Sequence, residues 1–157
     1  MTSRLPDDAT TAHATDDGSA VSLSEGRYLC GLLHLTLTGD PPVGTTELAG
    51  HLGVSAASVT ETIDAFERRG LVTHEPYYGA ELTARGERVA REFRWRQCTV
   101  RRFFERTSGV RLRDEQAYRI GWSLSLEDVR ALREVADQPC RGRCEATSAD
   151  GCHVSVT

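Results

Sequence analysis

The chain has 157 residues, enough for one or two small domains, and 39% of them are hydrophobic, which suffices for a modest core. No apolar run approaches the roughly 18 residues that suggest a membrane span, and the first thirty residues lack the basic start and apolar stretch of a signal peptide, so we expect a cytoplasmic protein. The net charge is −4 and all 19 basic residues are arginine, so no uniformly basic surface marks the chain as a nucleic-acid binder.

The N-terminal half predicts helices after a polar tail. Residues 1–20 are rich in Thr, Ala and Asp without hydrophobic periodicity, which is typical of a disordered acidic tail. Leucines at helical spacing predict a helix from about Ser24, its cap, to Leu37. The sequence TGDPPVG then breaks the helix, and a short helix is predicted from Thr45 or Thr46 to Leu52.

The stretch GVSAASVTETIDAFERRGLV, which begins at Gly53, predicts a turn and a further helix from near Ser55. Val59, Ile63 and Phe66 form the apolar stripe of that helix, and Gly70 ends it in the manner of a left-handed cap. Two short extended pieces then flank YYG, which predicts a hairpin. Helix, turn, helix and hairpin together indicate a winged helix-turn-helix domain over residues 21–84.

The remaining chain predicts a helical domain over residues 85–136 and a Cys-rich tail over residues 137–157. Three helices are expected in or next to this domain, at about 84–107, 114–121 and 126–135. The predicted fold is therefore mostly α, with a winged helix-turn-helix domain followed by a helical one.

The second helix of a helix-turn-helix lies in the major groove of double-stranded DNA, with its N-terminal residues at base edges. Here those residues are small or polar. Ser55 and Ser58 can bind phosphates, Ala57 allows close approach to a thymine methyl group, and Glu61 can accept a hydrogen bond from cytosine N4. The face therefore predicts a DNA-reading helix.

The charge distribution opposes a simple DNA-binding surface. From Asp40 to Thr83 the chain has seven acidic residues and two arginines, whereas residues 85–119 carry eleven arginines against five acids. The arginine cluster either reaches phosphates beside the wing or forms a salt-bridged helix face in a dimer. The sequence leaves both interpretations open.

The segments YLCGLLHL, GTTELAGHLGVSAASVTETIDAFERRGLV and LTARGERVA together resemble the DtxR (diphtheria toxin repressor) family of metal-dependent transcriptional regulators, over about residues 24–136. The resemblance implies a homodimer in which residues 85–136 form the dimerisation and metal-binding domain. Fe(II) or Mn(II) would order this dimer to fit a palindromic operator, as in an iron-dependent repressor. It also implies DNA contacts from Ser55, Ala57, Ser58, Thr60 and Glu61, with Glu61 at the main base-contacting position.

The family's metal ligands are not retained. Their positions fall on Arg27 and Cys30 in the first helix, on Gln97, and on Tyr118, Gly121 and Trp122. The last three supply none of the carboxylate and imidazole donors that Fe(II) and Mn(II) favour, and Arg27 would repel a cation. The ordinary sensor site of the family is therefore predicted to be dismantled.

Two sets of thiols remain as candidates for a different input. An odd number of cysteines in a cytosolic chain disfavours a disulfide framework. In the first set, two residues share one face of the first helix and the family fold would bring a third close to them, which suits zinc or a redox pair. The second set lies in the tail and suits zinc or an Fe–S cluster. The alternatives are simple buried cysteines and a disordered tail with incidental cysteines. The candidate residues are Cys30, His34 and Cys98 for the first set, and Cys140, Cys144, Cys152 and His153 for the second.

The expected function is a dimeric DNA-binding regulator under the control of a transition metal or of a Cys-based metal or redox signal. The alternative is an effector-independent winged-helix module for protein interaction. A thiol redox enzyme is disfavoured because no CxxC motif lies near a βαβ pattern, so no enzyme activity is expected.

Overall fold

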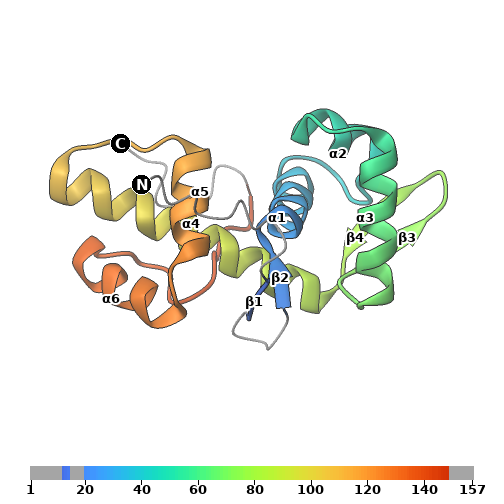
Figure 1. The fold of residues 1–157 in the computed structure, drawn as a ribbon. Helices are drawn as coiled ribbons and strands as arrows, with labels where there is room; N and C mark the ends of the chain where they lie inside the picture. The colour runs from blue at the N-terminus through green and yellow to red at the C-terminus, as the bar shows by residue number, and fades with distance from the viewer. Residues whose placement is uncertain (1–11, 15–19, 149–157) are drawn as a thin grey trace, which may run out of the picture.

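The computed structural model describes residues 12–14 and 20–148, and these residues form six helices and two small antiparallel sheets (Figure 1). One half of the molecule holds α1, α2, α3 and the β3–β4 hairpin, and the other holds α5 and α6. The long helix α4 (Ala84–Ser108) connects the two halves. Within the described residues, no helix is both long enough and apolar enough to cross a membrane.

Helix α1 (Leu23–Thr38) is capped two residues earlier than the sequence predicts. Its cap is Ser22, whose hydroxyl accepts from the amide of Glu25 at 3.1 Å, and the prediction of Ser24 as the cap is wrong. The reason is that β2 (Ala20–Ser22) leads directly into the helix and pairs with β1 (Ala12–Ala14). Strand β1 lies in the segment for which composition predicts a disordered tail, and residues 1–11 and 15–19 of that segment lie outside the described residues.

Helices α2 (Thr45–Leu52) and α3 (Ala56–Arg68) form the predicted helix-turn-helix. Gly53 at φ +67° makes the turn between them, a conformation that glycine adopts without strain. The stripe of Val59, Ile63 and Phe66 is fully buried, which confirms the predicted core face. Gly70, at φ +72°, follows the helix as predicted.

Strands β3 (Val72–Glu75) and β4 (Gly79–Leu82) form the predicted hairpin, or wing. Val43, between α1 and α2, adds a bridge to its edge through two hydrogen bonds with Ala80, at 2.9 and 2.8 Å. The winged helix-turn-helix is therefore confirmed, and its parts share one core with α1 and the start of α4.

Gly86 allows the first turn of α4 to pack closely against the backbone of Leu71, next to the wing. The cap of α4 is Thr83, which accepts from the amide of Gly86 at 3.0 Å, and a Cβ at Gly86 would collide with the carbonyl oxygen of Leu71. This explains a glycine in the first turn of a helix, where alanine is otherwise preferred.

We expect Gly86→Ala to lower the free energy of unfolding by about 1–3 kcal/mol, because the new methyl group must displace backbone atoms. Urea denaturation followed by circular dichroism measures the change. Gly50→Ala is the matched control, since a Cβ there meets nothing within 4 Å, and it should leave stability unchanged or raise it by up to about 1 kcal/mol. Equal effects of the two substitutions would contradict the collision.

Helices α5 (Asp114–Ser123) and α6 (Leu126–Ala136) pack on the second half of α4. A small cluster of Trp95, Val129 and Cys140 lies between α4, α6 and the segment that follows α6. That segment, residues 137–148, runs back along α4, whereas Cys152 and His153 of the predicted tail lie outside the described residues.

Candidate DNA-binding face and interdomain pocket

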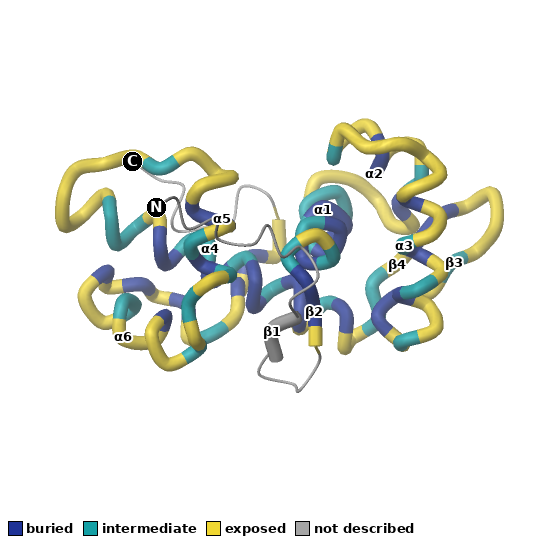
Figure 2. Tube along the Cα trace, in the orientation of Figure 1, coloured by how far each residue is buried: buried dark blue, intermediate teal, exposed yellow. Residues whose placement is uncertain are grey.

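The N-terminal face of α3 is open to solvent. Ser55 caps the helix, and all five residues expected to contact DNA are exposed, as the outer side of α3 shows in Figure 2. The opposite face is held rigid by the buried stripe described above, so the helix presents its polar face from a fixed position. The residues on that face are Ser55, Ala57, Ser58, Thr60 and Glu61.

The hydroxyl groups on this face differ in what they can still donate. Ser55 Oγ accepts from the amide of Ser58 at 3.1 Å and donates to Ser58 Oγ at 2.9 Å, which leaves the Ser58 hydroxyl proton available. Thr60 donates to the carbonyl of Ala56 at 3.0 Å. Ser58 is therefore the hydroxyl best prepared to donate to a phosphate, and Thr60 must first give up its intrahelical bond.

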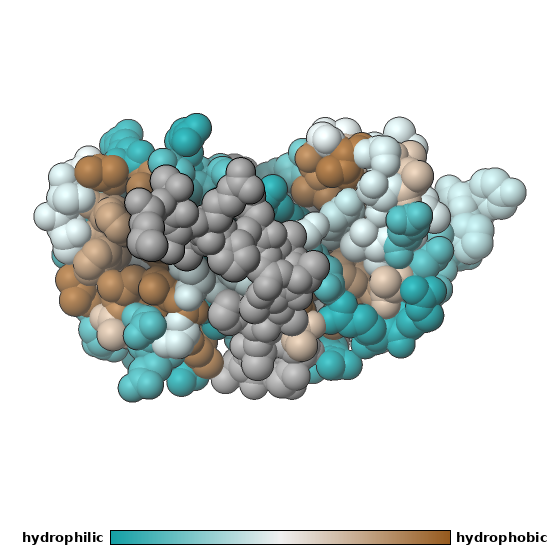
Figure 3. All heavy atoms as spheres, in the orientation of Figure 1, coloured by the Kyte–Doolittle hydropathy of each residue, from teal (hydrophilic) through white to brown (hydrophobic). Residues whose placement is uncertain are grey.

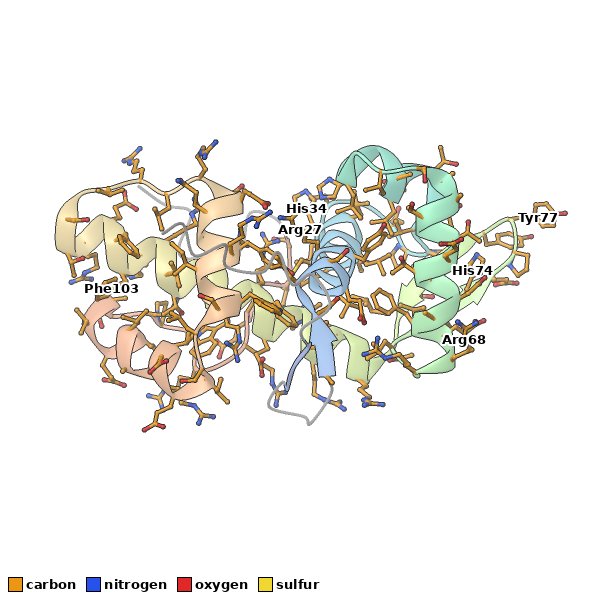
Figure 4. All side chains as sticks on the ribbon, in the orientation of Figure 1. Arg27, His34, Arg68, His74, Tyr77 and Phe103 are labelled. Carbon is orange, nitrogen blue, oxygen red and sulfur yellow. The ribbon has the colours of Figure 1, made fainter. Side chains whose placement is uncertain are left out.

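The wing presents an aromatic tip that sequence reasoning did not single out. Tyr77 is fully exposed at φ +71° and Tyr78 is 68% exposed. Figure 4 shows Tyr77 at the far end of the wing, pointing away from the body of the protein. The amide of His74 donates to the Glu67 carboxylate at 2.9 Å, which ties the wing to α3. The YYG turn in the sequence was the signal for such a tip.

Most of the arginine cluster is used within the protein. Six of its eleven arginines form ion pairs with carboxylates, and Arg102 donates to the carbonyl of Ala136 at 2.7 Å. These contacts favour the salt-bridged interpretation of the cluster over a phosphate-binding one. The six paired arginines are Arg91, Arg96, Arg101, Arg106, Arg111 and Arg119.

A pocket of about 470 Å³ lies between the two halves of the molecule, lined by α1, α2, α4 and α5. It brings together Cys30, His34 and Cys98, the first candidate set from the sequence. It also contains two residues that the sequence analysis did not single out, His51 and Arg94. The rings of His34 and His51 stack at a centroid distance of 4.9 Å.

At the positions where the resemblance places the family's metal ligands, the side chains contact other groups of the protein. Arg27 forms an ion pair with Glu115 and lies 5.6 Å over the ring of Tyr118. The hydroxyl of Tyr118 donates to the carbonyl of Leu23 at 2.7 Å. The same hydroxyl packs against Gly26, where a Cβ would collide with it. Gln97 donates to the carbonyl of Asp114 at 3.0 Å. These contacts are consistent with the predicted loss of the family's Fe(II) or Mn(II) site, which remains a prediction.

The backbone of α4 packs closely against Gly121, another of those positions. A Cβ there would lie 3.1 Å from the carbonyl oxygen of Arg96, and Arg96 donates to the carbonyl of Gly121 at 3.2 Å. The glycine is thus explained by helix packing, and the neighbouring Trp122 packs against the core.

The local environment favours the uncharged forms of Cys30 and His34, two candidate donors of the pocket. Burial raises the pKa of Cys30 to about 12, against a partial lowering by Arg94, so the thiol stays protonated and lies 3.8 Å from the carbonyl of Ala90. Burial, with His51 and Arg94 nearby, lowers the pKa of His34, which favours its neutral form. Among the described residues, no three His, Cys, Asp or Glu side chains are grouped as a metal site requires.

The two described tail cysteines are buried against α4. The carbonyl of Cys140 accepts from the indole of Trp95 at 3.0 Å and from Arg133 at 2.9 Å. Cys144 packs in a cluster with Cys98 and Leu37. The other members of the tail set, Cys152 and His153, are not described, so this set remains a prediction.

Comparison with known sequences gives two matches. The sequence profile of the family described as "Iron dependent repressor, N-terminal DNA binding domain" matches residues 27–80. An uncharacterized HTH-type transcriptional regulator of Methanocaldococcus jannaschii is 31% identical over 94 residues, which cover 59% of this chain and 75% of that relative.

Solved structures of metal-dependent regulators share the fold. IdeR of T. acidophilum superposes with a TM-score of 0.65 at 20% identity, covering 85% of this chain and 63% of IdeR. A manganese-dependent transcriptional repressor in complex with manganese gives a TM-score of 0.68 at 24% identity, covering 81% of this chain and 60% of the repressor. The present chain therefore spans less than two thirds of these longer proteins.

Proposed function

Because the chain belongs to the DtxR family of metal-dependent, DNA-binding transcriptional regulators, we propose that it works as a homodimer that binds a palindromic operator. Helix α3 of each protomer would lie in the major groove, with the wing beside it. The observation that carries the proposal is the exposed, small and polar start of α3 held on a buried stripe.

The side chains on that face have distinct roles in the proposal. Glu61 reads a base by accepting from cytosine N4, and Ala57 lets the helix approach closely. Ser55, Ser58 and Thr60 position the helix on phosphates. Because the domain around them is acidic, we expect few phosphate contacts in total and therefore a modest dependence of affinity on salt.

The helical half of the molecule is the proposed dimer interface. Val110 is 48% exposed and Val135 56% exposed, and Figure 3 shows hydrophobic residues gathered over the half formed by α5, α6 and the end of α4. Exposed apolar surface of this kind marks protein–protein contacts. Pairing there would leave both copies of α3 free to meet half-sites about 34 Å apart.

Control by a metal or redox signal is proposed through thiols, because Tyr118, Gly121 and Trp122, at the expected ligand positions, are unsuited to Fe(II) or Mn(II). The candidate is the tail set, Cys140, Cys144, Cys152 and His153, whose donor types suit zinc. Elemental analysis of anaerobically purified protein, compared with the variant in which the three tail cysteines are serine, tests this. Zinc lost with the cysteines supports the tail site, and equal metal content in both proteins contradicts it.

The DNA-binding proposal is tested with DNA from upstream of the protein's own gene, in an electrophoretic mobility shift across a series of salt concentrations. We expect a shift whose affinity falls moderately with salt. No shift, or a slope near zero, would instead support the protein-interaction module.

A further inference from the structure

Thiols from three separate segments lie close together beside the long helix α4. Cys98 is on α4, and Cys144 is on the segment 137–148, which runs back along that helix (Figure 1). These two side chains pack in one cluster with Leu37, near the end of α1. The third thiol, Cys30 of α1, is near enough to Cys144 for the two to interact electrostatically. The sequence analysis placed Cys98 and Cys144 in different candidate sets, so their contact is a feature of the fold.

The main chain fixes Cys144 in this position. Its amide donates to the carbonyl of Arg91 at 2.9 Å, and its carbonyl accepts from the guanidinium of Arg91 at 2.9 Å. Arg91 and Cys98 lie about two turns apart on one face of α4. Cys144 is therefore held against the face of α4 that carries Cys98, and such proximity is what a disulfide requires before it can form.

Both thiols border spaces that solvent can enter. Cys98 lines the pocket between the two halves of the molecule. Cys144, which is 4% exposed, lines a second pocket of about 460 Å³ between the segment 137–148, α4 and α6. Arg94, one turn before Cys98, lines the first pocket with it, and a neighbouring cation stabilises the thiolate that reacts with oxidants. Cys98 is therefore suited to react first, and Cys144 to react second.

The other described cysteines are less suited to this chemistry. Burial raises the pKa of Cys30 to about 12, and its Sγ lies 3.8 Å from the carbonyl oxygen of Ala90. The thiol therefore stays protonated, and a protonated thiol is a poor nucleophile. Cys140 packs in a different cluster, with Trp95 and Val129.

We propose that Cys98 and Cys144 are a modification site, at which a peroxide produces a disulfide. The Cys98 thiolate attacks one peroxide oxygen and the O–O bond breaks, which gives a sulfenic acid on Cys98 and a hydroxide ion. The hydroxide takes up the proton that Cys98 released. The sulfur of Cys144 then attacks the sulfur of Cys98, the S–S bond forms, and the hydroxyl group leaves with the Cys144 proton as water. Both thiols are oxidised, and hydrogen peroxide is reduced to water.

Titration of the full chain with hydrogen peroxide tests the pair, with a chelator present because Cys144 also belongs to the proposed zinc set. Trypsin cleaves after arginine, so the disulfide would join the peptide 97–101 to the peptide 144–157 in a non-reducing digest analysed by mass spectrometry. Cys152 lies in the same peptide as Cys144, so the C152S variant assigns the bond. We expect the joined peptides in the wild type and in C152S, at about one equivalent of peroxide per chain.

C30S is the matched control and should give the same joined peptides. C144S should give none, and the sulfenic acid on Cys98, which then persists, should be labelled by dimedone several times more than in the wild type. The backbone hydrogen bonds of Cys144 remain in this variant, so the segment should stay in place. Absence of the joined peptides from the oxidised wild type, or a bond from Cys98 or Cys144 to Cys30 or Cys140 in their place, overturns the proposal.

The disulfide would join the segment 137–148 to α4 beside Leu37, whose helix α1 belongs to the DNA-reading half. Control of operator binding by this bond rests on the proposed function. We expect peroxide to change the wild type's operator affinity severalfold, reversibly on addition of dithiothreitol, and to leave that of C144S unchanged. Unchanged wild-type affinity with the disulfide formed overturns the regulatory role alone, whereas absence of any operator binding by the reduced protein overturns the proposed function and leaves the disulfide result standing.

Discussion

Operator affinity is expected to fall by about 100-fold or more when Ala57 is replaced by Glu. Ala57 is exposed in the first turn of α3, and Glu61 follows one helical turn later. The substitution adds bulk and a second carboxylate to the surface that would meet base edges and phosphates. Fluorescence anisotropy with labelled operator DNA at a fixed salt concentration measures the loss.

The fold itself should tolerate this change. Glu is a good helix former, and the N-terminal turn of a helix favours negative charge. Ala84→Glu is the control with the same change of charge, because Ala84 is exposed in the first turn of α4, which packs against Leu71 beyond the C-terminal end of α3, and its effect on affinity should stay within about twofold. Unchanged affinity in the Ala57 variant would show that the start of α3 does not contact DNA.

The second large effect is expected at the buried ion pair of α4. Glu92 and Arg96 are 2% and 3% exposed, and their side chains lie 3.3 Å apart. Removing the carboxylate in Glu92→Ala leaves a guanidinium buried without its counter-charge. We expect the free energy of unfolding to fall by about 3–5 kcal/mol, measured by urea denaturation.

The double variant Glu92→Met/Arg96→Met separates the charge from the packing. Both charges are absent, and two long apolar side chains fill similar volume, so most of the lost stability should return. The remaining loss would come from the carbonyls of Gly121 and Leu124, which accept from Arg96 at 3.2 and 2.8 Å. A double variant as unstable as the single one would show that the unpaired charge is not the cause.

Local patterns predicted the DNA-reading half well. The cap at Ser55, the stripe of Val59, Ile63 and Phe66, and the hairpin after Gly70 all depend on residues close together in the chain. Such signals lie in the periodicity of apolar residues and in turn chemistry, both of which a single sequence displays.

Features set by distant contacts were not predicted. The cap of α1 moved to Ser22 because β2 pairs with β1, a partner that composition does not reveal. Arg94 and His51 meet His34 only because α2 and α4 both pack against α1. For the arginine cluster, the sequence shows how many charges there are. It does not show the partner of each arginine, because that depends on which helix faces it.

The segment after α6, residues 137–148, is anchored to α4 through its main chain. Its backbone carbonyls at Cys140, Cys144 and Ala146 accept from Trp95 and Arg91 of α4. Since these anchors use main-chain oxygens, cysteine-to-serine replacements leave them in place. A chain that stops at Ala136, by contrast, would leave the indole N–H of Trp95 and the guanidinium of Arg91 without these acceptors. Residues 137–148 therefore behave as an integral strap of the helical half, and proteolytic trimming should spare them in the folded protein.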